Sequence, residues 1–366
     1  MKGSTKVLAR KLSSRKRRQR LSGTILRTPE DLASAGLIPP EDVERITPVA
    51  ARFPVAITPA IAALIDPRDP ADPIARQFVP SEAERGTRPY QNADPIGDAR
   101  HSPVPGIVHR HRDRVLLKLT HVCPVYCRFC FRREMVGPGA EQTLTPAALD
   151  AALAYIASHP EIWEVILTGG DPFMLSPRRL KDVTARLCAI SHVQVLRWHT
   201  RMPVADPERI TDALVRAIKS DKATYVAIHV NHARELSSAA RCAAARLADA
   251  GFPLLSQSVL LKGVNDDAAT LQALMRALVE SRIKPYYLHH MDLAPGTEHF
   301  RTEIADGQAL MRQLRAAASG LCQPDYVLDI PDGYVKARLS PCDLEQTKSS
   351  SRLRDAQGVW HDYTPR

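Results

Sequence analysis

Six short apolar runs alternate with longer segments of helical periodicity, and this alternation restricts the fold more than any other feature of the chain. The runs, rich in β-branched residues, lie at 115–120, 164–168, 194–199, 224–230, 254–261 and 284–290. The helical segments lie at 146–158, 177–189, 207–219, 237–249, 267–281 and 303–317. Strand and helix units that recur about every 30 residues are typical of parallel sheets. They predict an α/β fold, an incomplete (β/α)6 barrel, with 326–330 as one more short strand.

The regions outside these units differ in composition, and we expect four parts. Residues 1–29 form a basic, disordered arm. Residues 30–107, rich in proline, form a mainly helical N-terminal extension packed on the barrel, with helical pieces at 40–46 and 58–64. The barrel spans 108–340, and 341–366 is a C-terminal tail.

The composition, 44% hydrophobic and 25% charged over 366 residues, is that of an ordinary soluble protein. We find no apolar stretch long enough to span a bilayer and no apolar core of a secretory signal in 1–29. The arm holds ten Lys or Arg and no acid, so its removal leaves 40 basic and 40 acidic residues. The net charge of +10 is therefore a property of the arm, which we interpret as solvated. Binding to nucleic acid or an acidic protein, or a transit peptide, are weaker alternatives.

Seven cysteines include three in the spacing C-x3-C-x2-C, Cys123, Cys127 and Cys130, directly after the first predicted strand. Three thiolates can ligate three irons of a [4Fe–4S] cluster and leave the fourth iron open. A zinc site with His121 as fourth ligand, or three unrelated thiols, are the alternatives. The other four cysteines are scattered singly, which favours a reducing cytoplasm over a disulfide framework.

Polar motifs follow the ends of the predicted strands. Besides the cysteines they are the segments 168–172, 199–201, 229–232 and 289–292, with Gln257 inside the fifth strand. In parallel barrels the active site forms at the carboxyl ends of the strands. The motifs therefore predict one site at one rim.

With Phe129 before its last cysteine, the loop resembles the cluster loop of radical S-adenosylmethionine enzymes. That resemblance implies that the open iron chelates S-adenosylmethionine and that an electron from the cluster releases a 5′-deoxyadenosyl radical. The residues that match the segment pairing with the amino group of S-adenosylmethionine are Gly169, Gly170 and Asp171, although Gly-Gly-Asp alone usually marks a turn. His229 and Asn231 could contact the adenosyl group, or could simply cap or pack.

A longer resemblance runs from about Pro54 to Lys336, over which the chain is similar to the lysine 2,3-aminomutase family. The matching stretches are 57–59, 72–77, 102–106, 109–117, 130–133, 257–266, 285–288, Asp292 and 299–301. That family uses pyridoxal 5′-phosphate together with S-adenosylmethionine. The resemblance implies transfer of the α-amino group of L-lysine to C3, through an aldimine radical, to give β-lysine.

The same resemblance assigns roles to single residues. Lys336 matches the Schiff-base lysine, and Arg132 matches the arginine that pairs with the substrate carboxylate. Asp292 and Asp329 match the two aspartates that hold the far ammonium of lysine. The positions that contact the cofactor phosphate correspond to Arg110, Arg114 and Gln257. Taken singly, Lys336 would be a surface lysine and each aspartate a loop cap.

Three departures from the family pattern affect these expectations. The lysine loop is glycine-rich in the family but carries Asp332, Tyr334 and Val335 here, which puts cofactor placement in doubt. The continuation after Lys336 also differs. Asp267 occupies the first of four zinc-binding cysteine positions of the longer members, and 343–366 hold no cysteine. We therefore expect no zinc and no zinc-linked oligomer contacts.

The expected partners are L-lysine, an electron donor of the flavodoxin or ferredoxin type and further copies of the chain, without a membrane and without nucleic acid. Several alternatives stay open. The isomerase could supply (R)-β-lysine for modification of elongation factor P, or act on another amino acid. The chain could also be a radical S-adenosylmethionine protein that has lost pyridoxal phosphate.

Overall fold

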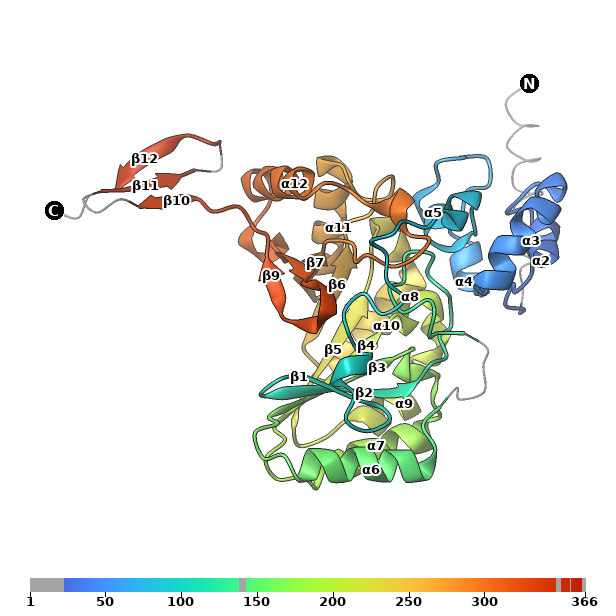
Figure 1. The fold of residues 1–366 in the computed structure, drawn as a ribbon, viewed down its shortest axis with the longest axis vertical. Coiled ribbons are helices and arrows are strands. Elements are labelled where there is room, and N and C mark those ends of the chain that lie inside the picture. Colours follow the sequence, from blue (N-terminus) through green and yellow to red (C-terminus); the bar gives the residue numbers. More distant parts are fainter. Residues whose placement is uncertain (1–22, 138–142, 347–349, 356, 364–366) are drawn as a thin grey trace.

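A computed structural model describes residues 23–137, 143–346, 350–355 and 357–363, and its centre is a curled sheet of nine strands (Figure 1). The strand order follows the chain, and the seven strands from β2 to β8 pair in parallel. They are β2 (Arg114–Thr120), β3 (Glu164–Gly169), β4 (Val195–Thr200), β5 (Ala223–His229), β6 (Leu254–Val259), β7 (Ile283–His289) and β8 (Asp325–Asp329). The predicted α/β incomplete barrel is confirmed.

Helices follow the parallel strands and pack around the sheet (Figure 1). They are α6 (Pro146–Ala157), α7 (Pro177–Cys188), α8 (Met202–Ala205), α9 (Asp212–Ile218), α10 (Ser238–Asp249), α11 (Ala268–Glu280) and α12 (Ile304–Ala317). Side chains cap the first turns of all of these except α8 and α12, as Ser176 does for α7. Asp267 caps α11 by accepting the N–H of Thr270. The predicted spans agree with these elements within two residues, except 207–219, where a 3-10 turn, η5 (Pro207–Arg209), precedes α9.

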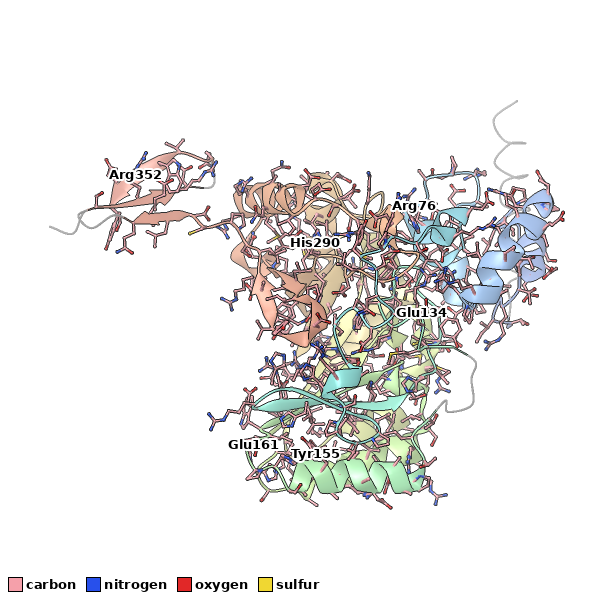
Figure 2. The ribbon with its side chains drawn as sticks, viewed as in Figure 1. Arg76, Glu134, Tyr155, Glu161, His290 and Arg352 are labelled. Carbon is pink, nitrogen blue, oxygen red and sulfur yellow. The ribbon has the colours of Figure 1, made fainter. Side chains whose placement is uncertain are left out.

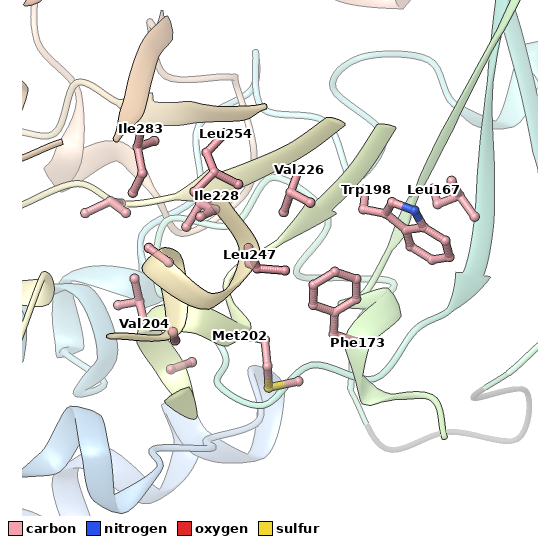
Figure 3. Close-up of a cluster of buried hydrophobic side chains, with 14 of the residues drawn as sticks. Leu167, Phe173, Trp198, Met202, Val204, Val226, Ile228, Leu247, Leu254 and Ile283 are labelled. Carbon is pink, nitrogen blue, oxygen red and sulfur yellow. The ribbon is translucent and has the colours of Figure 1, made fainter. Parts of the chain in front are cut away.

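Alternation along the strands separates the core from the barrel interior. Leu167 and Trp198 point outward and are fully buried among the helices, where Trp198 lies 5.8 Å from the ring of Phe173 (Figure 3). The neighbouring residues Ile166 and Arg197 therefore face the inside of the half-barrel, because successive strand side chains point to opposite faces. The interior can thus carry polar groups without disturbing the core.

Two antiparallel strands that the sequence analysis did not predict border the barrel. β1 (Ile107–His111) pairs with β2, and β9 (Lys336–Arg338) pairs with β8. In the β8–β9 register Lys336 lies opposite Asp329. β9 therefore brings Lys336 back to the barrel, next to the end of β8.

The N-terminal extension contains α2 (Pro29–Ser34), α3 (Val43–Arg52), α4 (Pro59–Ala62), α5 (Pro73–Phe78) and the 3-10 turns η1 (Pro40–Asp42), η2 (Glu82–Arg85) and η3 (Ala99–His101). It packs on the barrel core through Ile57, Ile61 and Phe78, all fully buried. The predicted pieces at 40–46 and 58–64 fall on η1 with α3 and on α4. Most of the basic arm, residues 1–22, lies outside the described residues.

The C-terminal tail forms a second, antiparallel sheet of β10 (Leu344–Gln346), β11 (Ser351–Arg354) and β12 (Trp360–Tyr363), which projects from the barrel (Figure 1). Arg352 lies on this sheet (Figure 2) and pairs with Glu345 and Asp362 at 3.7 and 3.6 Å. The sequence analysis predicted no strands here. Among the described residues, no helix has the length and apolar character needed to cross a membrane.

Two glycines fit the end of β3 tightly against the loop that follows β2. A Cβ on Gly169, which has a φ of 109°, would lie 2.5 Å from the carbonyl oxygen of Thr120. A Cβ on Gly170 would lie 2.3 Å from the carbonyl oxygen of Val122. The N–H of Asp171 donates to that same oxygen at 2.9 Å. The close approach that these two glycines allow is to the backbone of the cysteine loop.

We predict that Gly170→Ala destabilises the protein by about 1–3 kcal/mol, because the added methyl must push backbone apart. Denaturant unfolding measures the change. Gly320→Ala is the control, since its Cβ would meet nothing within 4 Å. An equal, small effect of both substitutions would contradict the packing described for Gly170.

Candidate active site

One cavity of about 480 Å³ occupies the inside of the half-barrel. It reaches from residues after the strand ends, such as Cys127, to Asp113 and Trp163, which precede β2 and β3. It is thus longer than the rim that the sequence analysis expected. The predicted site residues that line it are Arg110, Arg114, Cys123, Cys127, Cys130, Arg132, Gly169, Gly170, Asp171, His229, Gln257, Asp292, Asp329 and Lys336.

The three loop cysteines are free and partly buried. Burial raises the pKa of the Cys123 thiol well above its ordinary value and that of Cys130 to about 11. Thiolates here therefore need a cationic partner. Within the described part of the chain, no three His, Cys, Asp or Glu side chains converge on a single metal ion. In an iron–sulfur cluster each cysteine thiolate holds a different iron, so the three sulfurs need not meet at one ion.

Buried arginines attach the cysteine loop to the N-terminal extension. Glu84 on η2 is fully buried and accepts from Arg128 at 3.0 and 2.6 Å. It also pairs with Arg133. Burial opposes ionisation of Glu84, but the charges of Arg128 and Arg133 outweigh it and lower the pKa of its carboxyl. The loop is thus held by ion pairs rather than by regular secondary structure.

Asp171 connects the ends of β3 and β4. Its carboxylate accepts from the Thr200 hydroxyl at 2.8 and 2.9 Å and from the N–H groups of Arg201 and Phe173 at 2.7 and 3.0 Å. Burial raises the pKa of this carboxyl. Asp171 lines the cavity as expected, yet most of its hydrogen-bonding capacity already supports the site from within.

Two histidines on neighbouring strands, His199 and His229, face the cavity with ring centroids 6.0 Å apart. Burial lowers the pKa of His229 to about 3 and that of His199 well below its ordinary value, so both are neutral at pH 7. Gln257 lies 3.5 Å from the Nε2 atom of His199. Neutral rings and an amide suit a polar, uncharged ligand such as a nucleoside.

Asn231 packs inside the protein, which is one of the two roles that the sequence analysis left open. It is buried, its Nδ2 donates to Gln77 at 3.1 Å, and its Oδ1 accepts from the N–H of Val259 at 2.8 Å. Since both polar ends of the side chain are used internally, its position supports a structural role and gives no support to a direct contact with the adenosyl group.

Asp98 does not line the cavity but pairs with two residues that do, and the sequence analysis missed it. It is buried, and three cations surround it: Arg132 at 3.0 Å, Arg110 at 3.4 Å and Lys118 at 3.9 Å. Despite its burial, the charges of Arg132, Lys118 and Arg110 lower the pKa of its carboxyl. Asp98 precedes η3 in the extension and follows no strand, so the strand-end pattern could not reveal it. Its place just before the matching stretch 102–106 was the available signal.

Lys336 lies in the cavity beside the carboxylates, in contrast to Asp98, which lies among cations. Its amine pairs with Asp329, whose carboxylate also lies 3.7 Å from His289. Desolvation opposes ionisation of Asp329, but His289 and Lys336 overcome it and hold its pKa well below the usual range. Desolvation and the nearby charge of Asp329 raise the pKa of Asp292 to about 7. One carboxylate is thus firmly charged, whereas the other lacks a full counter-ion.

The altered lysine loop still delivers its lysine to the cavity. Asp332 and Gly333 take left-handed φ values of 66° and 78°. Tyr334 and Val335, which also depart from the family pattern, are 66% and 54% exposed. The differing side chains therefore project outward, and the amine of Lys336 remains inside. An amine with several nearby cations is the donor set that an aldehyde phosphate such as pyridoxal phosphate requires.

Comparisons with known proteins agree with this geometry. Residues 117–274 match the model of the Radical SAM superfamily, which implies a [4Fe–4S] cluster and S-adenosylmethionine. The chain is 37% identical to the L-lysine 2,3-aminomutase of Clostridium subterminale over 93% of its own length and 82% of that protein. It is 39% identical to the L-lysine 2,3-aminomutase of Escherichia coli, over 76% of its own length and 80% of that protein. It is 35% identical to the glutamate 2,3-aminomutase of Clostridioides difficile, over 82% of its own length and 71% of that protein.

Such identity over most of the length of both partners, together with the three cysteines, Lys336 and the paired aspartates in one cavity, makes the chain a member of the lysine 2,3-aminomutase family of radical S-adenosylmethionine isomerases.

Proposed function

We propose that the protein moves the α-amino group of L-lysine to C3, giving β-lysine, with pyridoxal phosphate bound at Lys336. The observation that carries the proposal is the placement of Lys336 and two aspartates in the cavity that the three cysteines also line. The amine offers a covalent attachment point, and the carboxylates offer a place for a second ammonium. A cavity with only one of these features would fit many other ligands.

Each end of the substrate has a partner of opposite charge. The guanidinium of Arg132 suits a carboxylate, since it presents parallel donors. Asp292 and Asp329 suit a distant ammonium, because a cation between two carboxylates relieves their repulsion. A glutamate side chain would instead bring a third negative charge to this pair. The charge pattern therefore favours lysine over glutamate, although a relative carries the latter name.

The chain's own residues bind and orient the cofactor and the substrate and shield them from water. Arg110 and Arg114 provide positive charge for the cofactor phosphate, Gln257 offers it a neutral amide, and His199 offers a further neutral polar contact. Lys336 holds the cofactor before substrate arrives, and Asp329 keeps its amine in place. When bound, the cluster with S-adenosylmethionine supplies a carbon radical that removes hydrogen, and pyridoxal phosphate supplies a ring that delocalises an unpaired electron. The enclosing half-barrel limits the approach of water.

The setting of the enzyme follows from less direct features. All seven cysteines are free, which supports a reducing compartment such as the cytoplasm and suits an oxygen-sensitive cluster. A small electron-transfer protein of the flavodoxin or ferredoxin type would supply the electron. The projecting sheet exposes Leu344, Leu353 and Tyr363 on one face. Because so small a sheet has little core of its own, we propose that further copies of the chain cover it.

Anaerobic reconstitution with iron, sulfide and pyridoxal phosphate tests the function. With S-adenosylmethionine and a reductant, mass analysis should find β-lysine from lysine and no isomer from glutamate. Asp292→Ala should lower lysine turnover at least tenfold, since a hydrogen bond to a charged group contributes about 1.5–3 kcal/mol. Asp325→Ala, on the same strand as Asp329 but in an exposed pair with Arg338, is the control and should be unaffected. Unchanged turnover in Asp292→Ala would refute the lysine assignment, and activity in Lys336→Ala would refute the cofactor assignment.

The raised pKa of Asp292 predicts a pH dependence of lysine binding. Its carboxyl is half-protonated near pH 7 in the free protein, and an ammonium binds only the ionised form. Below pH 7 a proton must therefore leave for each lysine bound, so the KM should rise up to about tenfold per pH unit as pH falls. Above pH 7 the KM should level off. Asp292→Asn should bind lysine more weakly without this slope, and a slope that persists in Asp292→Asn would assign the titration to another group.

Asp98→Asn should make the thermal stability of the protein depend more strongly on a bound anion such as the phosphate of pyridoxal phosphate. The substitution leaves Arg110, Lys118 and Arg132 without their shared counter-charge, so the cofactor-free protein should melt at a lower temperature. Pyridoxal phosphate should then raise the melting temperature by more than it does in the unsubstituted protein. Asp249→Asn, which alters an exposed pair with Arg282 outside the cavity, should change little. Equal stabilisation by pyridoxal phosphate with and without the Asp98→Asn change would contradict this role.

A further inference from the structure

Arg201 is a buried arginine that touches a cysteine of the loop. It follows β4 and is 7% exposed, and its Nη1 donates to the Sγ of Cys127 at 3.1 Å. Its Nη2 donates to Gln77 at 2.8 Å and pairs with Glu235, which is fully buried. Its guanidinium also lies 5.4 Å from the ring centroid of Phe129. The group is therefore fixed on several sides, with one N–H directed at sulfur.

The other two cysteines have a different environment. The peptide groups of Asp171 and Arg132 lie near Cys123 and Cys130, and the charges of Arg132 and Arg133 also act on Cys130. Among the described side-chain hydrogen bonds, Cys127 is the one of the three whose sulfur accepts from a charged group, at 3.1 Å. A cluster held by this loop would therefore feel an asymmetric field, strongest at the Cys127 ligand.

A positive charge and an N–H directed at a ligand sulfur both favour the more reduced, more negative state of an iron–sulfur cluster. Hydrogen bonds to the sulfurs and local charge are among the factors that set cluster potentials. Inside the protein, where the dielectric constant is low, a charge at this distance acts far more strongly than it would in water. Arg201 should thus raise the reduction potential, and the negative charge of Glu235 should partly offset it.

We propose that Arg201 tunes the cluster, raising its reduction potential through Cys127, and that Glu235 limits this effect. The inference rests on the proposed function, in that the three cysteines must hold a cluster. Gln77, which fixes the guanidinium, lies on α5 of the N-terminal extension. The extension would thereby help to determine how easily the electron that starts the reaction enters the site.

A purely structural role for Arg201 makes a different prediction from a tuning role. If the arginine merely supports the loop, its removal should lower the amount of cluster bound, without moving the potential of the cluster that remains. If it tunes the cluster, substitutions that change the charge in opposite senses should move the potential in opposite directions. The sign of the change, rather than its presence, separates the two roles.

Redox titration of the anaerobically reconstituted full-length protein, followed by electron paramagnetic resonance without substrate, is the test. Arg201→Gln should give a more negative midpoint potential, and Arg201→Lys, which keeps the charge, should lie closer to the unsubstituted protein. Glu235→Gln should give a more positive midpoint. Arg197→Gln is the matched control, because Arg197 on β4 forms a similarly buried pair with Glu164 on β3 at 2.9 Å. Arg197 lies four residues before Arg201, roughly 13 Å away along the strand direction, so its substitution should leave the midpoint unchanged.

The possible results distinguish a missing cluster from a cluster that Arg201 does not influence. Absence of a four-iron signal in the unsubstituted protein would refute the cluster itself. A normal cluster whose midpoint is the same in Arg201→Gln, or moves in a positive direction, would overturn the tuning role alone. Should Arg201→Gln hold no cluster, Glu235→Gln decides: a positive shift supports the inference, and an unchanged midpoint refutes it.

Discussion

A buried carboxylate, Glu84, binds Arg128 and Arg133 and so fixes the cysteine loop to the N-terminal extension. Residues 121–137, which hold the cysteines, form no helix or strand, so contacts with other segments shape this part of the loop. A buried carboxylate between two arginines is costly to break, about 3–5 kcal/mol when one partner is removed. The extension is thus part of the site, although it contributes none of the three cysteines.

Pairing of buried charges with groups of opposite charge also organises the cavity. Cations from β1, β2 and the cysteine loop gather around Asp98, whereas carboxylates gather around Lys336. A small molecule with a carboxylate at one end and an ammonium at the other would complement both groups. The neutral histidines His199 and His229 and the amide of Gln257 line the same cavity. These uncharged groups suit a nucleoside, which carries no formal charge. Cations and carboxylates that line one cavity would favour one orientation of the proposed substrate over the reverse.

The sequence was sufficient to predict the barrel, because short runs rich in apolar and β-branched residues alternate with helical segments, most of which start at a capping residue. It also located Lys336, Asp292 and Asp329, by resemblance rather than by pattern. What it could not predict depends on contacts between distant segments. Asp98 and Arg201 acquire their roles only when the extension folds over the loop, and Asn231 proved to be used internally. β9 and the strands of the tail are short and mostly polar, so no periodicity marked them.

The central claim is that the cysteine loop and Lys336 serve one substrate in one cavity. Lysine carrying deuterium at C3 tests this most directly, with the reconstituted protein, S-adenosylmethionine and a reductant. The account predicts that deuterium from C3 appears in the 5′ position of 5′-deoxyadenosine and returns to the β-lysine product. Formation of 5′-deoxyadenosine without deuterium while lysine is present would contradict it, because the radical would then arise out of reach of the bound amino acid.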